Sequence, residues 1–402
     1  MAKKNVTLDS LFKDMKKLNP FSESLNKSDF ALPTGFIDTG NYMLNAAFTG
    51  DIYGGCPNNR AVCLAGESGA GKTYILLQLC KNAQKEGYHI IYYDTEGAVD
   101  SEMAENLGID TSKFQHEPVS SIEKFRTSIT MVTKTLIDAK ISGGETPKIF
   151  IALDSLGMLA TEKEINDSID GSDKADFTRA KKIRSLFRII TSDLTGLKIP
   201  LVFTNHVGVN IGGYGDPVVM GGGEGLKYSA SIIACFSKAK LKEDGSDSKR
   251  QTGIVLTSKM WKNRFAQPHN IKIHLDFKKG LNRFIGLHEY ISWDNCGIQR
   301  GNLISQKDYD KLGDADREKA RCFTHDDNDL IFYPKDTARN FIVKHLGTGV
   351  TAKDLFTERV FNKEHVLDIL NENVIKPKFQ FGSGLDVGDE IVDLLTNGEE
   401  NE

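Results

Sequence analysis

Residues 61–85, AVCLAGESGAGKTYILLQLCKNAQK, decide how this chain folds. The stretch begins with a short apolar run that is typical of a buried strand and ends with apolar residues at helical spacing. Between them lies a complete G-x-x-x-x-G-K-T pattern, in which glycines let successive backbone N–H groups point at phosphate oxygens. The pattern predicts a phosphate-binding loop made of Gly66, Glu67, Ser68, Gly69, Ala70, Gly71, Lys72 and Thr73.

Two acidic residues are expected beside this loop. Asp154 ends an apolar run at residues 149–154, and Glu96 follows another at residues 89–94. Because parallel strands end at one edge of a sheet, both carboxylates should lie near the phosphates. We expect Lys72 to contact the phosphates, Glu96 to orient water, and Mg²⁺ to be held by Thr73 and Asp154. A turn-capping aspartate and a solvated loop acid are the alternatives for Asp154 and Glu96.

The rest of the chain indicates the fold class. Apolar runs at residues 61–66, 89–94, 149–154 and 199–205 alternate with amphipathic helical segments. Strands that are apolar on both faces are typical of a parallel sheet covered by helices on both sides. Three further β-rich runs, at residues 231–238, 253–259 and 271–277, are expected to extend the sheet in antiparallel fashion. The expected fold is α/β with a P-loop nucleotide-binding core.

Four parts are predicted along the chain. Residues 1–40 form an N-terminal oligomerisation arm, residues 41–288 the core, residues 289–385 a small C-terminal domain and residues 386–402 an acidic tail. Within the third part, residues 335–376 are expected to form mainly short helices. The tail has seven acidic side chains and no Lys or Arg, which is typical of a solvated segment.

Composition excludes several classes of protein. No run of about 18 apolar residues and no apolar N-terminal stretch occurs, so we expect neither a membrane span nor a secretory signal and predict a cytoplasmic protein. Six cysteines without a CxxC pair argue against a disulfide framework and a zinc site. The net charge of −4 means that any nucleic-acid binding must rest on local patches.

Two segments are candidates for such patches. The run at residues 207–225 follows Asn205 and His206 and contains eight glycines, so it is expected to become ordered only when something binds it. The second candidate is the helical segment at residues 174–188, which carries six basic residues, among them Arg179, Lys181 and Lys182, against one acid and could bind phosphates. A plain surface loop and a solvated charged face are the alternatives.

Taken together, these residues resemble the RecA family of homologous recombinases, and within it the UvsX group of tailed phages. The similarity runs from about residue 41 to about residue 286 and includes AGESGAGKT, YYDTEGAVDSEMAENLGID, TRAKKIRSLFRII and MGGG. It implies a RecA-like core that binds ATP and Mg²⁺ and hydrolyses ATP when DNA is bound. It further implies a phage recombinase of the host cytoplasm that forms helical filaments on single-stranded DNA, pairs it with a homologous duplex and exchanges strands.

The resemblance also implies roles for individual residues. Glu96 would activate water, His206 would sense the γ-phosphate, and Lys262 and Arg264 would reach the ATP of a neighbouring subunit. Asp100 and Met103 fall where the family contacts adenine. The implied DNA-binding residues are Arg179, Lys181, Lys182, Asn210, Gly212, Gly213, Tyr214, Gly222 and Gly223.

Partners and alternatives follow from the same comparison of motifs. The arm is expected to pack on an adjacent subunit, and a single-strand-binding protein and a recombination mediator are expected as further partners. The main alternative is a hexameric RecA-fold DNA helicase, which shares every nucleotide motif. A single-strand coat protein that uses ATP only as a ligand and a small-molecule P-loop kinase are two others.

Overall fold

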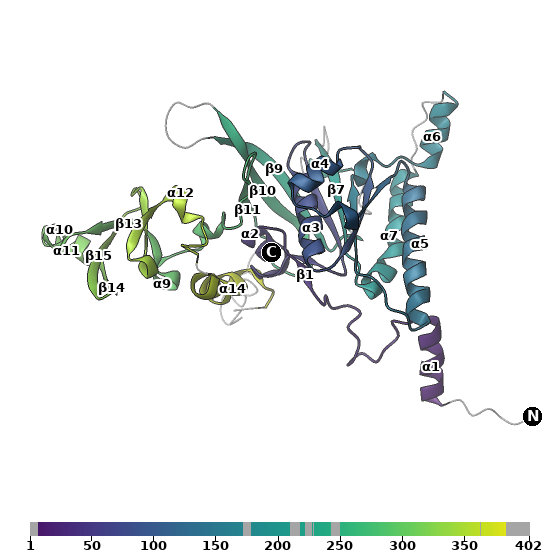
Figure 1. Ribbon diagram of the computed structural model, residues 1–402, viewed down its shortest axis with the longest axis horizontal. Coiled ribbons are helices and arrows are strands. Elements are labelled where there is room, and N and C mark those ends of the chain that lie inside the picture. Colours follow the sequence, from purple (N-terminus) through teal and green to yellow (C-terminus); the bar gives the residue numbers. More distant parts are fainter. Residues whose placement is uncertain are drawn as a thin grey trace, which may run out of the picture.

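A computed structural model describes residues 7–171, 178–209, 218–221, 227, 229–242, 250–361 and 363–382. Within these residues, a ten-stranded sheet forms the centre of the molecule (Figure 1). Its strands lie in the order β12-β11-β10-β9-β3-β7-β6-β4-β5, and β8 pairs with β7. They are β3 (Ala61–Gly66), β4 (His89–Asp94), β5 (Phe114–Pro118), β6 (Ile149–Asp154), β7 (Leu201–Val209), β8 (Val218–Met220), β9 (Ile232–Lys242), β10 (Gln251–Asn263), β11 (Ile271–Asp276) and β12 (Gly280–Leu281).

The strands from β9 to β5 in this order are parallel, and the expected parallel core is confirmed. The expectation that all three later runs extend the sheet antiparallel is wrong for the first of them. β9 pairs parallel with β3, with Ile232 opposite Val62. The Ser231 N–H donates a hydrogen bond to the carbonyl oxygen of Ala61, so β9 begins beside the start of β3, and the long connection from β7 allows this parallel pairing. Of the three runs, the second and third, in β10 and β11, have antiparallel pairings, as does β12 after them; β8 also pairs antiparallel with β7. The exposed edge strand β5 was not predicted because its residues, FQHEP, carry no apolar pattern.

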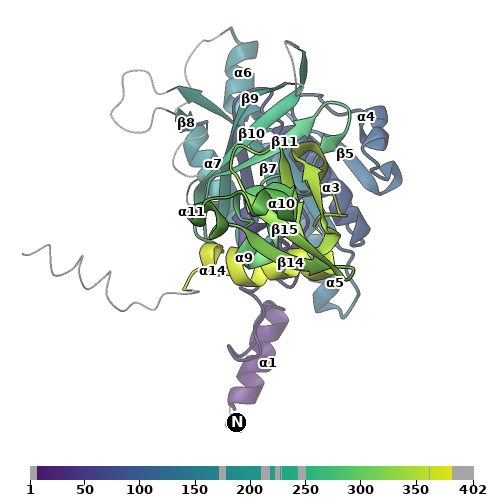
Figure 2. The ribbon, with the colours of Figure 1, turned by 90° about the vertical axis from the view of Figure 1, so that its left-hand side faces the viewer.

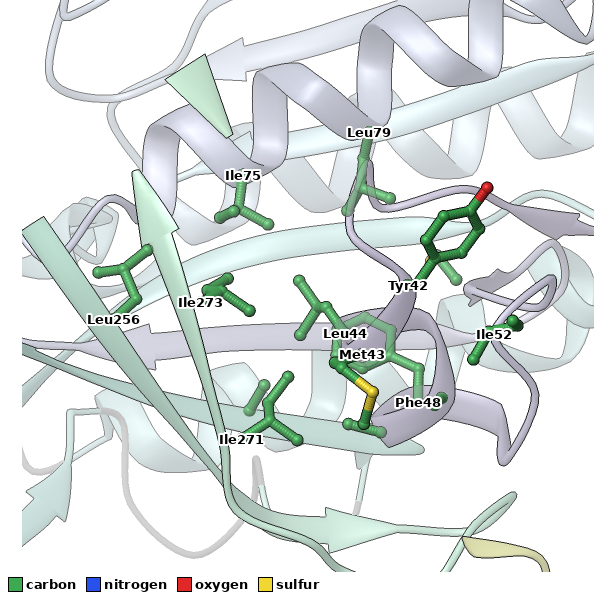
Figure 3. Close-up of a cluster of buried hydrophobic side chains, with 14 of the residues drawn as sticks. Tyr42, Met43, Leu44, Phe48, Ile52, Ile75, Leu79, Leu256, Ile271 and Ile273 are labelled. Atoms are coloured by element: carbon green, nitrogen blue, oxygen red, sulfur yellow. The ribbon is translucent and has the colours of Figure 1, made fainter. Parts of the chain in front are cut away.

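Helices cover both faces of the sheet, as an α/β fold requires. α2 (Tyr42–Thr49) and α3 (Lys72–Lys85) pack on one face, whereas α5 (Ile122–Ile141) and α7 (Arg179–Leu197) pack on the other. Neighbouring strand residues alternate between the two apolar clusters, so Val62 belongs to one and Cys63 to the other. Figure 3 shows the first cluster, in which Leu44 of α2, Ile75 of α3 and Ile273 of β11 meet.

The remaining elements before residue 290 are short. They are β1 (Phe36–Ile37) paired with β2 (Cys56–Pro57), α4 (Ser101–Asn106), α6 (Glu162–Ile169), and the single turns at Thr111–Lys113, Leu156–Met158 and Leu287–Glu289. None of the helices in the described ranges combines the length and the hydrophobicity that crossing a bilayer requires.

The chain after residue 290 contains a second, antiparallel sheet at the left of Figure 1. Its strands lie in the order β14-β15-β13-β16-β17. They are β13 (Ile298–Ile304), β14 (Arg321–His325), β15 (Asn328–Pro334), β16 (Asn340–Val343) and β17 (Thr348–Thr351), with the short helices α9 (Trp293–Cys296), α10 (Gln306–Tyr309), α11 (Asp314–Arg317) and α12 (Ala352–Leu355) beside them. The expectation of mainly short helices at residues 335–376 is therefore wrong for β16 and β17, where apolar residues pair with β13 and with each other across a turn at Gly347.

The chain then returns to the first sheet. Helical turns from Lys363 onward, including α13 (Asp368–Leu370) and α14 (Lys376–Phe379), bury Phe379 in the same apolar cluster as Phe48 of α2. The buried Asn371 accepts a hydrogen bond from the Ile52 N–H at 3.1 Å and donates one to Asp51 at 3.0 Å. These residues therefore complete the core around α2. The predicted division of the chain at residue 289 stays a prediction, and the acidic tail lies outside the described residues.

The N-terminal arm has two parts. α1 (Leu8–Leu18) buries none of its residues and extends away from the core in Figures 1 and 2, with Leu8 69% and Leu18 87% exposed. The segment after it lies on the core, because Asn59 and Lys198 both donate hydrogen bonds to the carbonyl oxygen of Leu32. An amphipathic helix is thus anchored at one end and exposes its apolar face.

The return of the C-terminal segment predicts the effect of Asn371→Ala. Removing this amide leaves the Ile52 N–H without its acceptor, so we expect the free energy of unfolding to fall by about 1–3 kcal/mol. Asn373→Ala, at an exposed asparagine two residues later, is the matched control and should change it by less than about 0.5 kcal/mol. Equilibrium unfolding in urea measures both. Equal stabilities of the two variants would contradict the packing of this segment onto α2.

Candidate functional site

The predicted phosphate loop joins β3 to α3. Gly66 has φ 151° and Gly69 and Gly71 have φ 69°, which side chains disfavour. A Cβ at Gly66 would lie 2.4 Å from the carbonyl oxygen of Phe236, so this position has no room for another residue. The buried Lys72 Nζ spans the loop and donates hydrogen bonds to the carbonyl oxygens of Gly66 at 2.9 Å and Glu67 at 2.8 Å. Burial lowers the pKa of Lys72, against the opposing effect of nearby carboxylates.

Asp154 lies at the centre of the site and is buried at the end of β6. Its Oδ2 accepts hydrogen bonds from Thr73 Oγ1 at 2.6 Å and from the Tyr92 hydroxyl at 3.0 Å, and its Oδ1 accepts one from the Thr204 hydroxyl. The structure thus brings together the two residues predicted to hold a metal. A carboxylate and a hydroxyl are hard oxygen ligands of the kind that Mg²⁺ prefers. Tyr92 and Thr204 were not predicted, although both lie on strands flanking Asp154.

Glu96 lies beside His206 at the same edge of the sheet. Glu96 Oε1 accepts a hydrogen bond from Ser155 Oγ at 2.6 Å and lies 3.1 Å from His206 Nε2. Burial raises the pKa of Glu96, but the hydrogen bonds from Ser155 and His206 outweigh burial and hold it below its ordinary value. Glu96 is therefore a carboxylate that can accept a proton from water. Ser155 was not predicted, since one serine after a strand carries no distinctive signal.

The strand that carries His206 also carries the start of the glycine-rich segment. β7 pairs antiparallel with β8, with Val207 opposite Met220. The side chain of Asn205 donates a hydrogen bond to the carbonyl oxygen of Gly221 at 2.7 Å, and the Gly221 N–H donates one to the carbonyl oxygen of His206 at 3.1 Å. The segment is thus closed onto the strand next to Glu96. The predicted DNA-binding residues Asn210, Gly212, Gly213, Tyr214, Gly222 and Gly223 lie outside the described residues.

The basic residues of α7 have different surroundings. Arg179 donates hydrogen bonds to the carbonyl oxygens of Leu156, Gly157 and Leu159, which ties the start of α7 to the turn after β6. Lys182 forms an ion pair with Glu123 at 2.6 Å, whereas Lys181 is exposed. DNA binding by these three residues stays a prediction, and Arg179 has a structural role as well.

Asp100 and Met103 lie together next to α3. Asp100 caps α4, accepting a hydrogen bond from the Met103 N–H at 2.7 Å. Both residues line a cavity of about 840 Å³ that Tyr74 of α3 and Phe277 also line. Since Tyr74 directly follows the phosphate loop, this cavity adjoins the first turn of α3, and adenine binding there stays a prediction.

Lys262 and Arg264 lie far from the phosphate loop of their own chain. At the end of β10, Asn263 pairs opposite Ile232, and Ile232 in turn pairs opposite Val62 near the start of β3. The phosphate loop begins at Gly66, four residues farther along this strand, which at about 3.3 Å per residue is roughly 13 Å from Val62. The two basic residues therefore lie toward the end of the sheet opposite their own phosphate loop.

Comparisons with known proteins agree with this geometry. The RecA N-terminal domain family matches residues 24–282. The recombination and repair protein of Enterobacteria phage T4 is 31% identical over 265 residues, which are 65% of this chain and 65% of the T4 protein. The RecA proteins of Streptomyces coelicolor and Streptomyces lividans are each 27% identical over 328 residues, with 81% of both chains covered. With a parallel core, a phosphate loop and a family match over more than half of its length, the chain belongs to the RecA N-terminal domain family.

Proposed function

We propose that the protein is a DNA-dependent ATPase and recombinase that assembles on single-stranded DNA as a helical filament, pairs it with a homologous duplex and exchanges strands. One observation carries the proposal. His206 contacts Glu96 and lies on the strand that closes the predicted DNA-binding segment through Gly221. A change at the nucleotide is thereby communicated to the DNA-contacting segment. The names of the relatives, a recombination and repair protein and RecA proteins, support the same function.

The residues of the site fit ATP and Mg²⁺. Lys72 and the loop N–H groups would bind the phosphates, and the oxygens of Thr73 and Asp154, 2.6 Å apart, would hold Mg²⁺, which neutralises phosphate charge. Glu96 orients the attacking water and accepts its proton, while Ser155 and His206 hold the carboxylate in place. The cavity beside Asp100 and Met103 would receive the adenine base.

Assembly is part of this proposal. Lys262 and Arg264 lie at the sheet edge opposite the phosphate loop, where they can complete the ATP site of a neighbouring subunit. Contact between opposite edges of identical chains is heterologous and grows into an open helix unless the rotation closes a ring. The exposed apolar face of α1 provides a second surface for the adjacent subunit.

Lys238 is an additional candidate for nucleotide binding. It lies on β9, and its Nζ donates a hydrogen bond of 2.6 Å to the carbonyl oxygen of Ser68 in the phosphate loop. In a trans peptide, this carbonyl and the N–H of Gly69 point in opposite directions. Lys238 thus fixes the direction of a backbone N–H that is expected to face phosphate.

Glu96→Gln tests the catalytic part of the proposal. We expect phosphate release in the presence of single-stranded DNA to fall by about 10² to 10⁴-fold, because the amide cannot accept a proton. ATP binding should persist, since the phosphate loop is unchanged. A phosphate-release assay with and without single-stranded DNA measures turnover, and a titration with a fluorescent nucleotide measures ATP binding. Wild-type protein whose turnover ignores DNA would contradict the proposal and favour a kinase, and absent turnover would favour a coat protein.

Lys238→Ala tests the additional loop contact. The variant should bind ATP about fivefold more weakly, the effect of losing about 1 kcal/mol of hydrogen bonding. The matched control is Lys240→Ala, because Lys240 is exposed on the same strand two residues later and points to the same side. Equilibrium titration with a fluorescent ATP analogue compares them. Equal affinities of the two variants would exclude a role of Lys238 in the loop.

Phe12→Ser tests the role of α1 in assembly. Phe12 is 58% exposed on the apolar face, and losing its burial against a neighbour should raise the protein concentration needed for filament assembly about tenfold. Lys13→Ser, on the polar side of the same turn, should leave the concentration needed for assembly unchanged. Electron microscopy on single-stranded DNA gives the readout. Closed rings that unwind a forked duplex, without filaments, would instead support the helicase alternative.

A further inference from the structure

A buried carboxylate that has no role in the preceding account holds the turn that carries Glu96. Asp94 ends β4 and is only 4% exposed. Its Oδ1 accepts hydrogen bonds from the backbone N–H groups of both Glu96, at 2.9 Å, and Gly97, at 2.7 Å. The direction in which Glu96 leaves the sheet therefore depends on the orientation of this carboxylate.

The other oxygen of this carboxylate has a partner from a neighbouring strand. His116, on β5, places its Nε2 3.0 Å from Asp94 Oδ2. The His116 ring is stacked on the Tyr92 ring, with the centroids 6.4 Å apart and the planes at 27°. The Tyr92 ring lies against one side of the His116 ring, and the hydrogen bond to Oδ2 favours one rotation of the carboxylate. A buried carboxylate needs such donors, because burying it without them is costly.

The opposite side of the same turn is held by β6. The Thr95 N–H donates a hydrogen bond to the carbonyl oxygen of Asp154 at 2.8 Å, and the Ser155 N–H donates one to Thr95 Oγ1 at 2.8 Å. Contacts from β6 thus fix one side, and Asp94 with His116 fixes the other. His116 is thus the partner of the second oxygen of Asp94, whose first oxygen is bonded to the turn itself.

We propose that His116 is a positioning residue for the water-activating carboxylate, acting through Asp94 on the turn that carries Glu96. The expected effect on kcat rests on the proposed ATPase function, whereas the expected effect on the position of the turn does not. His116 needs only an N–H at Nε2 to act, so a glutamine amide that reaches the same oxygen can replace it. A cavity of about 340 Å³ lined by Asp94, Thr95 and His116 leaves room for that side chain or for added imidazole.

Kinetics of three variants test the proposal. His116→Ala should lower kcat for DNA-stimulated ATP hydrolysis about tenfold or more, with the KM for ATP changed less than about twofold, because a displaced base affects the chemical step. His116→Gln should recover most of kcat, and added imidazole should partly restore His116→Ala. His89→Ala, at the exposed opposite end of β4, should match wild type. An unchanged kcat in His116→Ala, or a loss that neither glutamine nor imidazole restores, would overturn the proposal.

Amide hydrogen exchange provides a readout that does not need turnover. In His116→Ala the N–H groups of Glu96 and Gly97 should exchange at least about tenfold faster, and His116→Gln should restore their protection. Amides in the middle of β4 should keep their rates, which separates local release from general unfolding. If wild type failed to hydrolyse ATP, the proposed function would fall, whereas unchanged exchange at these two amides would overturn the role of His116.

Discussion

The parallel register of four strands is the constraint on which the rest of this structure depends. β3, β7, β6 and β4 lie side by side and run in the same direction, with Gly66 opposite His206 and Asp94 opposite Asp154. The phosphate loop, the metal-holding carboxylate and the base-bearing turn therefore meet at one edge. A slip of one residue in any pairing would turn side chains to the other face of the sheet and separate them.

Hydroxyl groups join these strand ends into one network. The hydroxyls of Thr73 on α3, Tyr92 on β4 and Thr204 on β7 donate hydrogen bonds to Asp154, and the Ser155 hydroxyl donates one to Glu96. Each donor comes from a different element, so the network keeps its geometry only while the strands keep their register. His206 adds to the network from β7, the strand that also pairs with β8.

Much of this arrangement was predictable from local pattern. The strands at 89–94 and 149–154 and the glycine loop each carry their signal within a few residues, and the structure has both strands with the same bounds. The roles of Tyr92 and Ser155 were not predictable from local pattern, because they depend on which strands become neighbours. The parallel pairing of β9, the strands at 340–351 and the return of Asn371 to α2 likewise depend on contacts between distant segments.

The central claim is that nucleotide binding and the affinity for single-stranded DNA are coupled through His206. Its most direct test is the affinity for single-stranded DNA with and without a non-hydrolysable ATP analogue, in wild type and in His206→Ala. The account predicts that the analogue tightens DNA binding by wild type at least about tenfold, a coupling free energy of about 1.4 kcal/mol or more, and DNA binding by the variant much less. Equal tightening in both proteins would contradict it.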